Sequence, residues 1–311
     1  MNFTESVKKE IMNKNSFSAC CVLAALSAYV RTSGTLIVEG GKIGFSISAD
    51  NEECINYIVN FAEKVFGEKA VINKGNGKKS RIKAQFLSDS SLRFLIEAGI
   101  VVQEGNSISL ALNIDKYLIE NTCCKKAYVV GAFLGSGSVT VPSENDLSTT
   151  GYHLEFVFSK YVTAQDFATL LGECDVTPGL IERNDCYVVY INSVGDLIDV
   201  LKMMNAEDSA KKVIEIVNTR ERKNNANRVV NCEMSNISKQ INAFIKQREA
   251  IKLIEDTLGI DSLPPQLKEV VEARNDNPED TMVELAQKLG ISKSCLNHRL
   301  RKIMEIANSI K

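Results

Sequence analysis

Three features are missing from this sequence of 311 residues. Its nine cysteines include no Cys-x-x-Cys pair, and an odd cysteine count does not indicate a disulfide framework. No apolar run approaches the roughly 20 residues that cross a bilayer. The formal net charge is only −2, so the overall charge favours no class of partner. We therefore expect a cytoplasmic protein with reduced thiols, no membrane association and two or three domains.

The apolar run at residues 17–30 follows Lys8 and Lys9 and has the form of a signal peptide. A similar run lies inside the chain at residues 128–141, where no signal acts. The fold therefore explains both runs better than export does.

The two apolar runs indicate an internal repeat. Residues 128–141 read YVVGAFLGSGSVTV, and residues 23–37 read LAALSAYVRTSGTLI. Aligning Gly34 with Gly137 also aligns two serines and two cysteine doublets: Ser33 with Ser136, and Cys20-Cys21 with Cys123-Cys124.

Small residues recur at a spacing of four in both copies. Gly131 and Gly135 share one face of a helix, as do Ala24 and Ala28. Such a strip lets two helix backbones approach closely. For either copy alone, an ordinary buried helix with a glycine C-cap is the alternative. The matched doublets and Ser-Gly endings favour a pair of packed helices.

Each copy and the segment that follows it have the same predicted order of elements: helix, two strands, helix, two strands, helix. Helices are predicted at about 52–66, 90–98, 163–174 and 194–204. Strands are predicted on both sides of 40–41, around 74–80, at 138–142 and 152–158, and on both sides of 184–185.

This arrangement resembles the LAGLIDADG homing endonucleases, whose paired motif helices lie at a pseudo-twofold axis. In an active enzyme of this type, the residue before the last glycine is Asp or Glu, and the two carboxylates hold divalent metal between the scissile phosphates. Here those positions are Ser33 and Ser136, and a neutral hydroxyl is a poor ligand for magnesium. Glu39 and Glu155 lie nearby, but their spacing does not favour them as substitutes. We expect no catalytic residues, no cofactor and no cleavage.

The matched cysteine doublets allow two interpretations. Helices paired at a pseudo-dyad would bring the four thiols to one end of the domain, where they could bind a metal. The alternative is packing, because free cysteine is usually a small buried residue and adjacent cysteines point to different sides of a helix. We favour packing and predict no metal.

Charge is distributed unevenly along the chain. Residues 128–219 contain 13 acidic and 5 basic side chains, which does not suit a surface that contacts phosphates. The first repeat has a basic hairpin at residues 74–81, whereas its counterpart at residues 182–185 is short and acidic. We infer that the tandem domain is no longer a symmetric DNA saddle, and binds a protein or only one side of a DNA site.

The character of the sequence changes at Arg220. Residues 220–236 are polar and basic without an apolar period, which predicts a linker or an arm. A phosphate-contacting segment and a solvated connector are equally good interpretations. The candidate phosphate contacts in this segment are Arg220, Arg222, Lys223 and Arg228. Helices are then predicted at about 237–258 and 265–274.

The last 31 residues contain a helix-turn-helix pattern at 281–307. Thr281 and Glu284 form a capping box that starts a helix, Gly290 supplies the turn, and Ser292 caps a second helix. Leu296, Leu300, Ile303 and Ala307 form the predicted core stripe of that second helix.

The opposite face carries the candidate DNA contacts. Asn297 suits the edge of adenine, Arg301 the edge of guanine, and Lys302 a phosphate. His298 shares this face, so we favour a DNA contact over an ordinary surface histidine. The full set of predicted DNA-binding residues here is Ser292, Lys293, Ser294, Asn297, His298, Arg301 and Lys302.

A degenerate LAGLIDADG tandem joined to a helix-turn-helix resembles the WhiA family of bacterial regulators over essentially the whole chain. The segments that carry the resemblance are VGAFLGSGSV at 130–139, YHLEF at 152–156, NRVVNCEMSN at 227–236 and SKSCLNHRLRKI at 292–303. The resemblance implies a nucleoid-associated regulator of sporulation, cell division or chromosome segregation that binds double-stranded DNA. It also implies a C-terminal domain similar to sigma-factor region 4.

The predicted fold class is α+β, with a tandem αββαββα domain followed by an all-α domain. The predicted segments are a first repeat at 1–119, a second at 120–219, a basic linker at 220–236 and a helical domain at 237–311. Two other functions stay open: a protein-interaction module for a sigma factor, RNA polymerase or another regulator, and a working endonuclease. For residues 227–236 we suggest only a role in domain docking.

Overall fold

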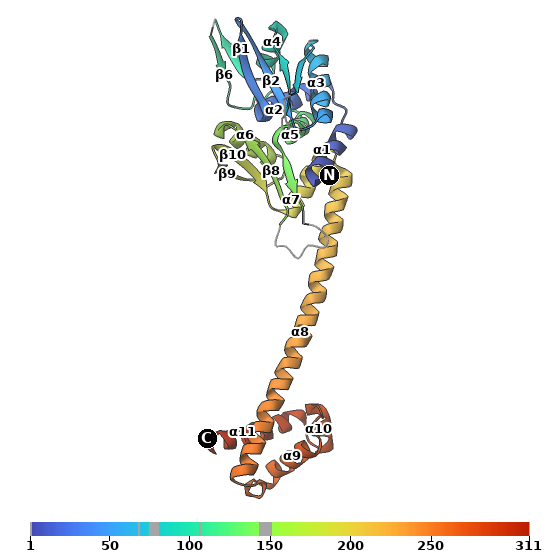
Figure 1. Ribbon diagram of the computed structural model, residues 1–311, viewed down its shortest axis with the longest axis vertical. Coiled ribbons are helices and arrows are strands. Elements are labelled where there is room, and N and C mark those ends of the chain that lie inside the picture. Colours follow the sequence, from blue (N-terminus) through green and yellow to red (C-terminus); the bar gives the residue numbers. More distant parts are fainter. Residues whose placement is uncertain (1, 68, 75–80, 106, 143–150, 311) are drawn as a thin grey trace. The chain divides into compact units, whose positions relative to one another are not determined.

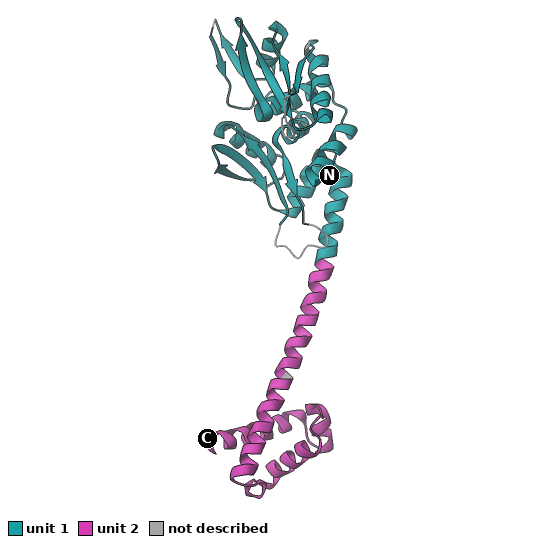
Figure 2. Cartoon of the chain, in the orientation of Figure 1, with its two compact units in different colours: residues 1–220 teal, residues 221–311 magenta. Residues whose placement is uncertain are grey.

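The computed structural model describes residues 2–67, 69–74, 81–105, 107–142 and 151–310 (Figure 1). The chain forms two compact units, residues 1–220 and residues 221–311 (Figure 2). Each unit has a hydrophobic core of its own. The predicted α+β class is confirmed, with strands in the first unit and a helical second unit.

The first unit contains the predicted αββαββα order twice. The first copy consists of α2 (Ala19–Ser33), β1 (Gly34–Glu39), β2 (Lys42–Ala49), α3 (Glu52–Phe66), β3 (Val71–Lys74), β4 (Ile82–Phe86) and α4 (Asp89–Glu97). The second consists of α5 (Thr122–Ser136), β7 (Ser138–Thr140), β8 (His153–Phe158), α6 (Tyr161–Gly172), β9 (Gly179–Arg183), β10 (Cys186–Ile191) and α7 (Val194–Met203). Residues 75–80, the centre of the predicted basic hairpin, lie outside the described residues.

The two copies build matching antiparallel sheets. Their strand orders are β1-β2-β4-β3 and β7-β8-β10-β9. In both sheets the strand that follows the motif helix occupies an edge and pairs with the next strand, as Gly34 with Ile47 and Ser138 with Glu155 show. Inward residues of β8 alternate with more exposed ones, as expected for a sheet with one buried face.

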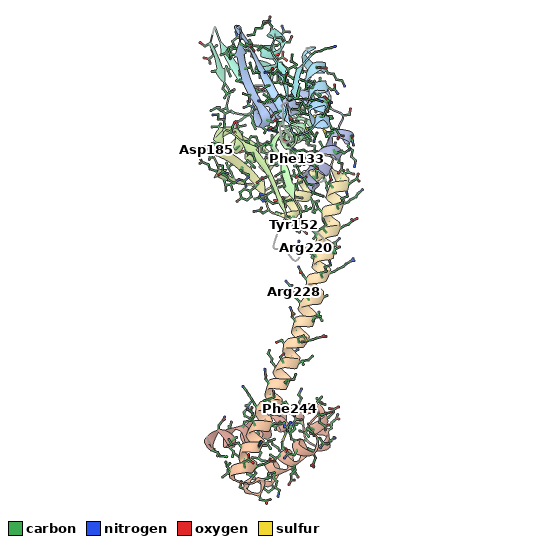
Figure 3. All side chains as sticks on the ribbon, viewed as in Figure 1. Phe133, Tyr152, Asp185, Arg220, Arg228 and Phe244 are labelled. Carbon is green, nitrogen blue, oxygen red and sulfur yellow. The ribbon has the colours of Figure 1, made fainter. Side chains whose placement is uncertain are left out.

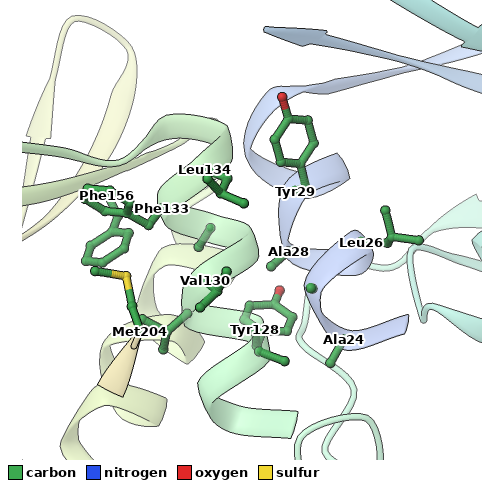
Figure 4. Close-up of a cluster of buried hydrophobic side chains, with 14 of the residues drawn as sticks. Ala24, Leu26, Ala28, Tyr29, Tyr128, Val130, Phe133, Leu134, Phe156 and Met204 are labelled. Atoms are coloured by element: carbon green, nitrogen blue, oxygen red, sulfur yellow. The ribbon is translucent and has the colours of Figure 1, made fainter. Parts of the chain in front are cut away.

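The helices α2 and α5 pack closely together at the centre of this unit (Figure 4). Ala24 and Ala28 are fully buried between them. A Cβ atom at Gly131 would collide with the carbonyl oxygen of Ala25, and one at Gly135 with the hydroxyl of Thr32. The predicted strip of small residues is therefore confirmed, because larger side chains there would separate the two backbones.

A helix, a hairpin and the part of a long helix that begins at Glu207 were not predicted in this unit. Helix α1 (Phe3–Lys14) begins at a capping box made by Asn2 and Glu5, and it buries Val7, Ile11 and Met12. The hairpin β5 (Val101–Glu104) and β6 (Ser107–Leu110) follows α4. No helix in the described ranges has the combination of length and apolar character that crossing a membrane requires.

The second unit consists of the end of a long helix and a bundle of shorter ones. Helix α8 (Glu207–Thr257) begins in the first unit and ends in the second. It is followed by the 3-10 turn η1 (Ile260–Ser262), α9 (Pro265–Asp276), α10 (Met282–Lys288) and α11 (Lys293–Ile310). Ile251 and Ile254 of α8 pack with Val270 and Leu285 in the core of this unit.

The prediction of a linker at residues 220–236 is wrong about local structure, because these residues are helical. Neither Gly nor Pro occurs between residues 207 and 257, and Arg, Lys, Glu and Ala are strong helix formers. Residues 221–239 are exposed on every side of the helix. Val230 and Met234 begin an exposed apolar stripe that continues at helical spacing through Ile237 and Ile241. Residues 220–236 contain only the start of this stripe, which is too short to show the period.

Candidate nucleic-acid interface

Helix α10 starts at the predicted capping box. The Glu284 amide donates to the Thr281 hydroxyl at 3.3 Å, and the Thr281 amide donates to the Glu284 carboxylate at 2.8 Å. These hydrogen bonds satisfy two amides that the first helical turn leaves without partners, and they lower the pKa of Glu284. Gly290 then adopts a φ of 62°, which favours glycine and turns the chain between α10 and α11.

The second helix, α11, is held by its predicted core stripe. The Cys295 amide donates to the Ser292 hydroxyl at 3.1 Å, which confirms Ser292 as the cap. Leu296, Leu300, Ile303 and Ala307 are all buried against α8, α9 and α10. Burial on one side fixes which side of α11 faces solvent.

The solvent face of α11 contains the predicted contact residues. Ser294, Asn297, His298 and Arg301 lie within about 100° of arc, given about 100° of rotation per residue. All the predicted residues of this helix and its cap are exposed: Ser292, Lys293, Ser294, Asn297, His298, Arg301 and Lys302. Throughout the described part of the chain, Lys293, Arg301 and Lys302 form no ion pair. We call this set the α11 polar face.

Arg299 differs from the other basic residues of this helix. Its guanidinium donates to the carbonyl of Gln266 at 3.3 Å and lies 3.5 Å from the Glu269 carboxylate. Both partners belong to α9, on the flank away from the α11 polar face. Arg299 therefore joins α11 to α9, and only three of the four basic side chains in residues 292–302 face solvent freely.

A surface cavity of about 1040 Å³ lies beside the N-terminal end of α11. Lys293 and Asn297 of the α11 polar face line it, together with Lys239 and Arg248 of α8. Arg274 forms its inner wall, where it donates to the carbonyl of Asp280 at 2.7 Å and contacts the Phe244 ring at 5.1 Å. Lys239 and Arg248 are exposed basic residues that our sequence prediction did not select.

The four candidate phosphate contacts predicted within residues 220–236 all belong to α8. Figure 3 labels two of them, Arg220 and Arg228. Arg222, Lys223 and Arg228 are exposed, and Arg220 is half-buried. At about 100° per residue they point in different directions around the helix. The structure therefore does not gather these four residues into one basic stripe.

The serines at the degenerate motif positions hold helix ends to strands. The Ser33 hydroxyl donates to the carbonyl of Ser48 in β2 at 2.6 Å. The Ser136 hydroxyl accepts from the amide of Val157 in β8 at 3.0 Å. Each serine therefore joins its motif helix to the second strand of its own repeat, without a charge.

The two nearby glutamates, Glu39 and Glu155, do not supply a pair of free carboxylates that could replace the motif acids. Glu155 lies 3.1 Å from the Arg183 guanidinium and 3.3 Å from the His153 ring. Burial alone would raise the pKa of Glu155, but hydrogen bonds from Arg183, His153 and other groups lower it overall. Glu39 is exposed at the end of β1, opposite Lys42. Glu155 therefore forms an ion pair with Arg183.

Three sequence profiles of one family match consecutive parts of the chain. They are described as the WhiA N-terminal LAGLIDADG-like domain at residues 19–100, the WhiA LAGLIDADG-like domain at 125–223 and the WhiA C-terminal HTH domain at 226–307.

Curated relatives cover the same length. Proteins named "Probable cell division protein WhiA" are 34% identical in Clostridium botulinum and 33% identical in Clostridium beijerinckii, each over 100% of this chain and 99% of the relative. The crystal structure of full-length DUF199/WhiA from Thermatoga maritima shares the fold, with a TM-score of 0.60 and 24% identity over 99% of both chains.

Proposed function

Because this chain belongs to the WhiA family, we propose that it is a sequence-specific DNA-binding regulator of transcription without nuclease activity. The observation that carries the proposal is the α11 polar face, which is exposed opposite a buried apolar stripe. We propose cell division, the process in the name of its curated relatives, as the process it regulates, with chromosome segregation and sporulation as related alternatives.

In the proposed mode of binding, α11 enters the major groove with its N-terminal half. Asn297 can pair with the N6 and N7 groups of adenine, and Arg301 with the O6 and N7 groups of guanine. His298 lies between them on the same face and contacts a base or a phosphate. Lys293 and Lys302 flank these residues at the two edges of the face and neutralise phosphates, while Ser292 and Ser294 donate to them. Lys239 and Arg248, beside the same face, extend the phosphate contacts to α8.

The tandem domain supports DNA binding without cleavage in this proposal. Ser33 and Ser136 both use their hydroxyls to join helix to strand and have no charge for a divalent cation. Glu155 is occupied by Arg183. We expect supercoiled DNA that contains a bound site to stay intact during prolonged incubation with the protein and magnesium. Magnesium-dependent cleavage at that site would instead restore the nuclease hypothesis.

The acidic second repeat is proposed to contact a protein. Residues 128–219 carry 13 acidic and 5 basic side chains, so they repel phosphates and suit a basic surface. RNA polymerase, a sigma factor or another regulator are the proposed partners. The alternative function is an interaction module whose affinity for DNA is incidental.

The test of DNA reading measures binding of the full chain to a selected DNA site over a range of salt concentrations. Arg301→Ala is expected to cost about 1–3 kcal/mol and to relax the base preference at one position, as the loss of a bidentate base contact does. Lys302→Ala is expected to weaken binding to all sequences and to reduce the salt slope by about one.

Lys268→Ala is the matched control. It removes the same charge from the same unit, but Lys268 of α9 is paired with Asp261 of η1 at 2.6 Å. Equal losses for Arg301→Ala and Lys268→Ala would show that only overall charge matters, and would support the interaction module.

A further inference from the structure

The thiols of the two cysteine doublets meet in the first unit. Cys20 and Cys21 belong to the first turn of α2, and Cys123 and Cys124 to the first turn of α5. Their four Sγ atoms all lie within 4.8 Å of one another. Cys20 and Cys123 are exposed, whereas Cys21 and Cys124 are buried.

The dimensions of this cluster are near those of a tetrahedral thiolate site. A zinc–sulfur bond of about 2.3 Å places the sulfur atoms of a tetrahedral site about 3.8 Å apart. The Sγ atoms of Cys123 and Cys124 are 4.0 Å apart, and the widest pair of the cluster is within 4.8 Å. The sulfurs therefore need to move by about 1 Å or less, which side-chain rotation can supply.

Adjacent cysteines point to different sides of a single helix, and this was the reason to favour packing from the sequence. The structure removes that objection because two helices meet here. Each doublet contributes one buried and one exposed thiol, and the two exposed thiols close the outer side of the cluster.

The helix ends favour thiolates, whereas burial opposes them by raising the pKa of the Cys21 and Cys124 thiols. The cluster lies at the N-terminal ends of two helices, where backbone amides and the helix dipole stabilise negative charge. Neither first turn contains an acidic residue. The Ser18 hydroxyl lies 3.3 Å from the Cys20 sulfur, within reach of a hydrogen bond to it. A surface cavity of about 710 Å³, which Cys20 lines, gives a metal ion access from solvent.

We propose that Cys20, Cys21, Cys123 and Cys124 bind one Zn²⁺ ion and thereby tie the two repeats together at the N-terminal ends of α2 and α5. Four thiolates fill the tetrahedral shell of zinc and leave no open position, so the ion is structural. Zinc binding displaces the four thiol protons to solvent and involves no change in oxidation state. The site lies far in sequence from α11 and is independent of the proposed DNA contacts.

The experiment uses the full chain, reduced and stripped of metal, and titrates it with Co²⁺ as a spectroscopic substitute for Zn²⁺. We expect the intense thiolate-to-cobalt charge-transfer band and the visible bands of tetrahedral cobalt, at one equivalent per chain. Zn²⁺ should then bleach these bands by displacing cobalt, and it should raise the melting temperature of the protein.

Two sets of variants make the test specific. The double variant Cys20→Ser with Cys123→Ser changes the two exposed cysteines, so the core stays packed. It should weaken metal binding about 100-fold or more, because it removes two ligands, and the loss of one outer-shell partner already costs up to about 100-fold. Cys232→Ser changes an exposed cysteine of α8 and should leave the spectrum unaltered.

Three results would overturn the proposal. One is the absence of a thiolate-to-cobalt band in the reduced protein, and another is a band that persists in the double variant. The third is a pair of disulfides among the four cysteines, detected by mass, in protein whose reduced form binds no metal.

Discussion

At the scale of single residues, the close approach of α2 and α5 depends on Gly131. A Cβ at this position meets the backbone of Ala25, which cannot move away as a flexible side chain could. We predict that Gly131→Ala destabilises the first unit by about 1–3 kcal/mol, the usual effect of overpacking. The measurement is the urea concentration at the midpoint of unfolding, monitored through a spectroscopic signal of the first unit.

Gly172→Ala is the control for this prediction. Gly172 lies at the end of α6, and nothing stands within 4 Å of the position that its Cβ would take. This substitution should be neutral or slightly stabilising, since alanine restricts the unfolded chain. If both substitutions had the same effect, the tight contact at Gly131 would not control stability.

Residue types alone identified the motif serines but not their contacts. The sequence places Ser33 and Ser136 where an active LAGLIDADG motif has acids, and this sufficed to predict the missing charge. Their hydrogen bonds to β2 and β8 depend on strand register, which is set by pairing between distant residues. Likewise, the attachment of Arg299 to α9 could not be seen from the helix that contains it.

At the scale of elements, the first helix stabilises the beginning of α8. The Glu10 carboxylate accepts from the amides of Asp208 and Ser209 at 2.7 and 2.9 Å, and from the Ser209 hydroxyl at 2.6 Å. An anion at a helix N-terminus satisfies free amides and interacts favourably with the helix dipole. Burial alone would raise the pKa of Glu10, but hydrogen bonds from Ser209, Lys14 and Asp208 lower it below 4.5.

A pH dependence of stability follows from this lowered pKa. The folded protein holds the Glu10 carboxylate charged more strongly than the unfolded chain does, so its contribution is fully present above about pH 4.5. The contribution is lost as the pH falls through the folded pKa. We predict that Glu10→Gln lowers the melting temperature at pH 7 and that the difference from the natural protein shrinks below pH 4.5. A difference that stays constant down to low pH would contradict this role.

A periodic buried face made some elements predictable, although α1, which buries Val7, Ile11 and Met12, was missed. Helix α11 buries four apolar residues at helical spacing, so its stripe and its polar side were both predictable. The middle of α8 is exposed all round, and its helical structure was not predicted. The hairpin of β5 and β6 was missed because it lies outside the repeated αββαββα order that guided the strand predictions.

At the scale of the whole molecule, two units with different chemistry are joined by one helix. The tandem unit has a LAGLIDADG-like fold with uncharged motif positions and an acidic second half. The helical unit presents the α11 polar face. We propose that the second unit reads DNA sequence and that the first is auxiliary.

Genome-wide occupancy of the full chain tests this claim most directly. The protein would be compared in its host with a variant that carries Asn297→Ala and Arg301→Ala, and with Lys268→Ala as the control of equal charge change. We predict discrete peaks that share a sequence for the natural protein and for the control, and loss of those peaks for the double variant at equal protein level. If the double variant kept the same peaks, the tandem unit or a bound partner would hold the protein on DNA, and the assignment of α11 as the reader would be wrong.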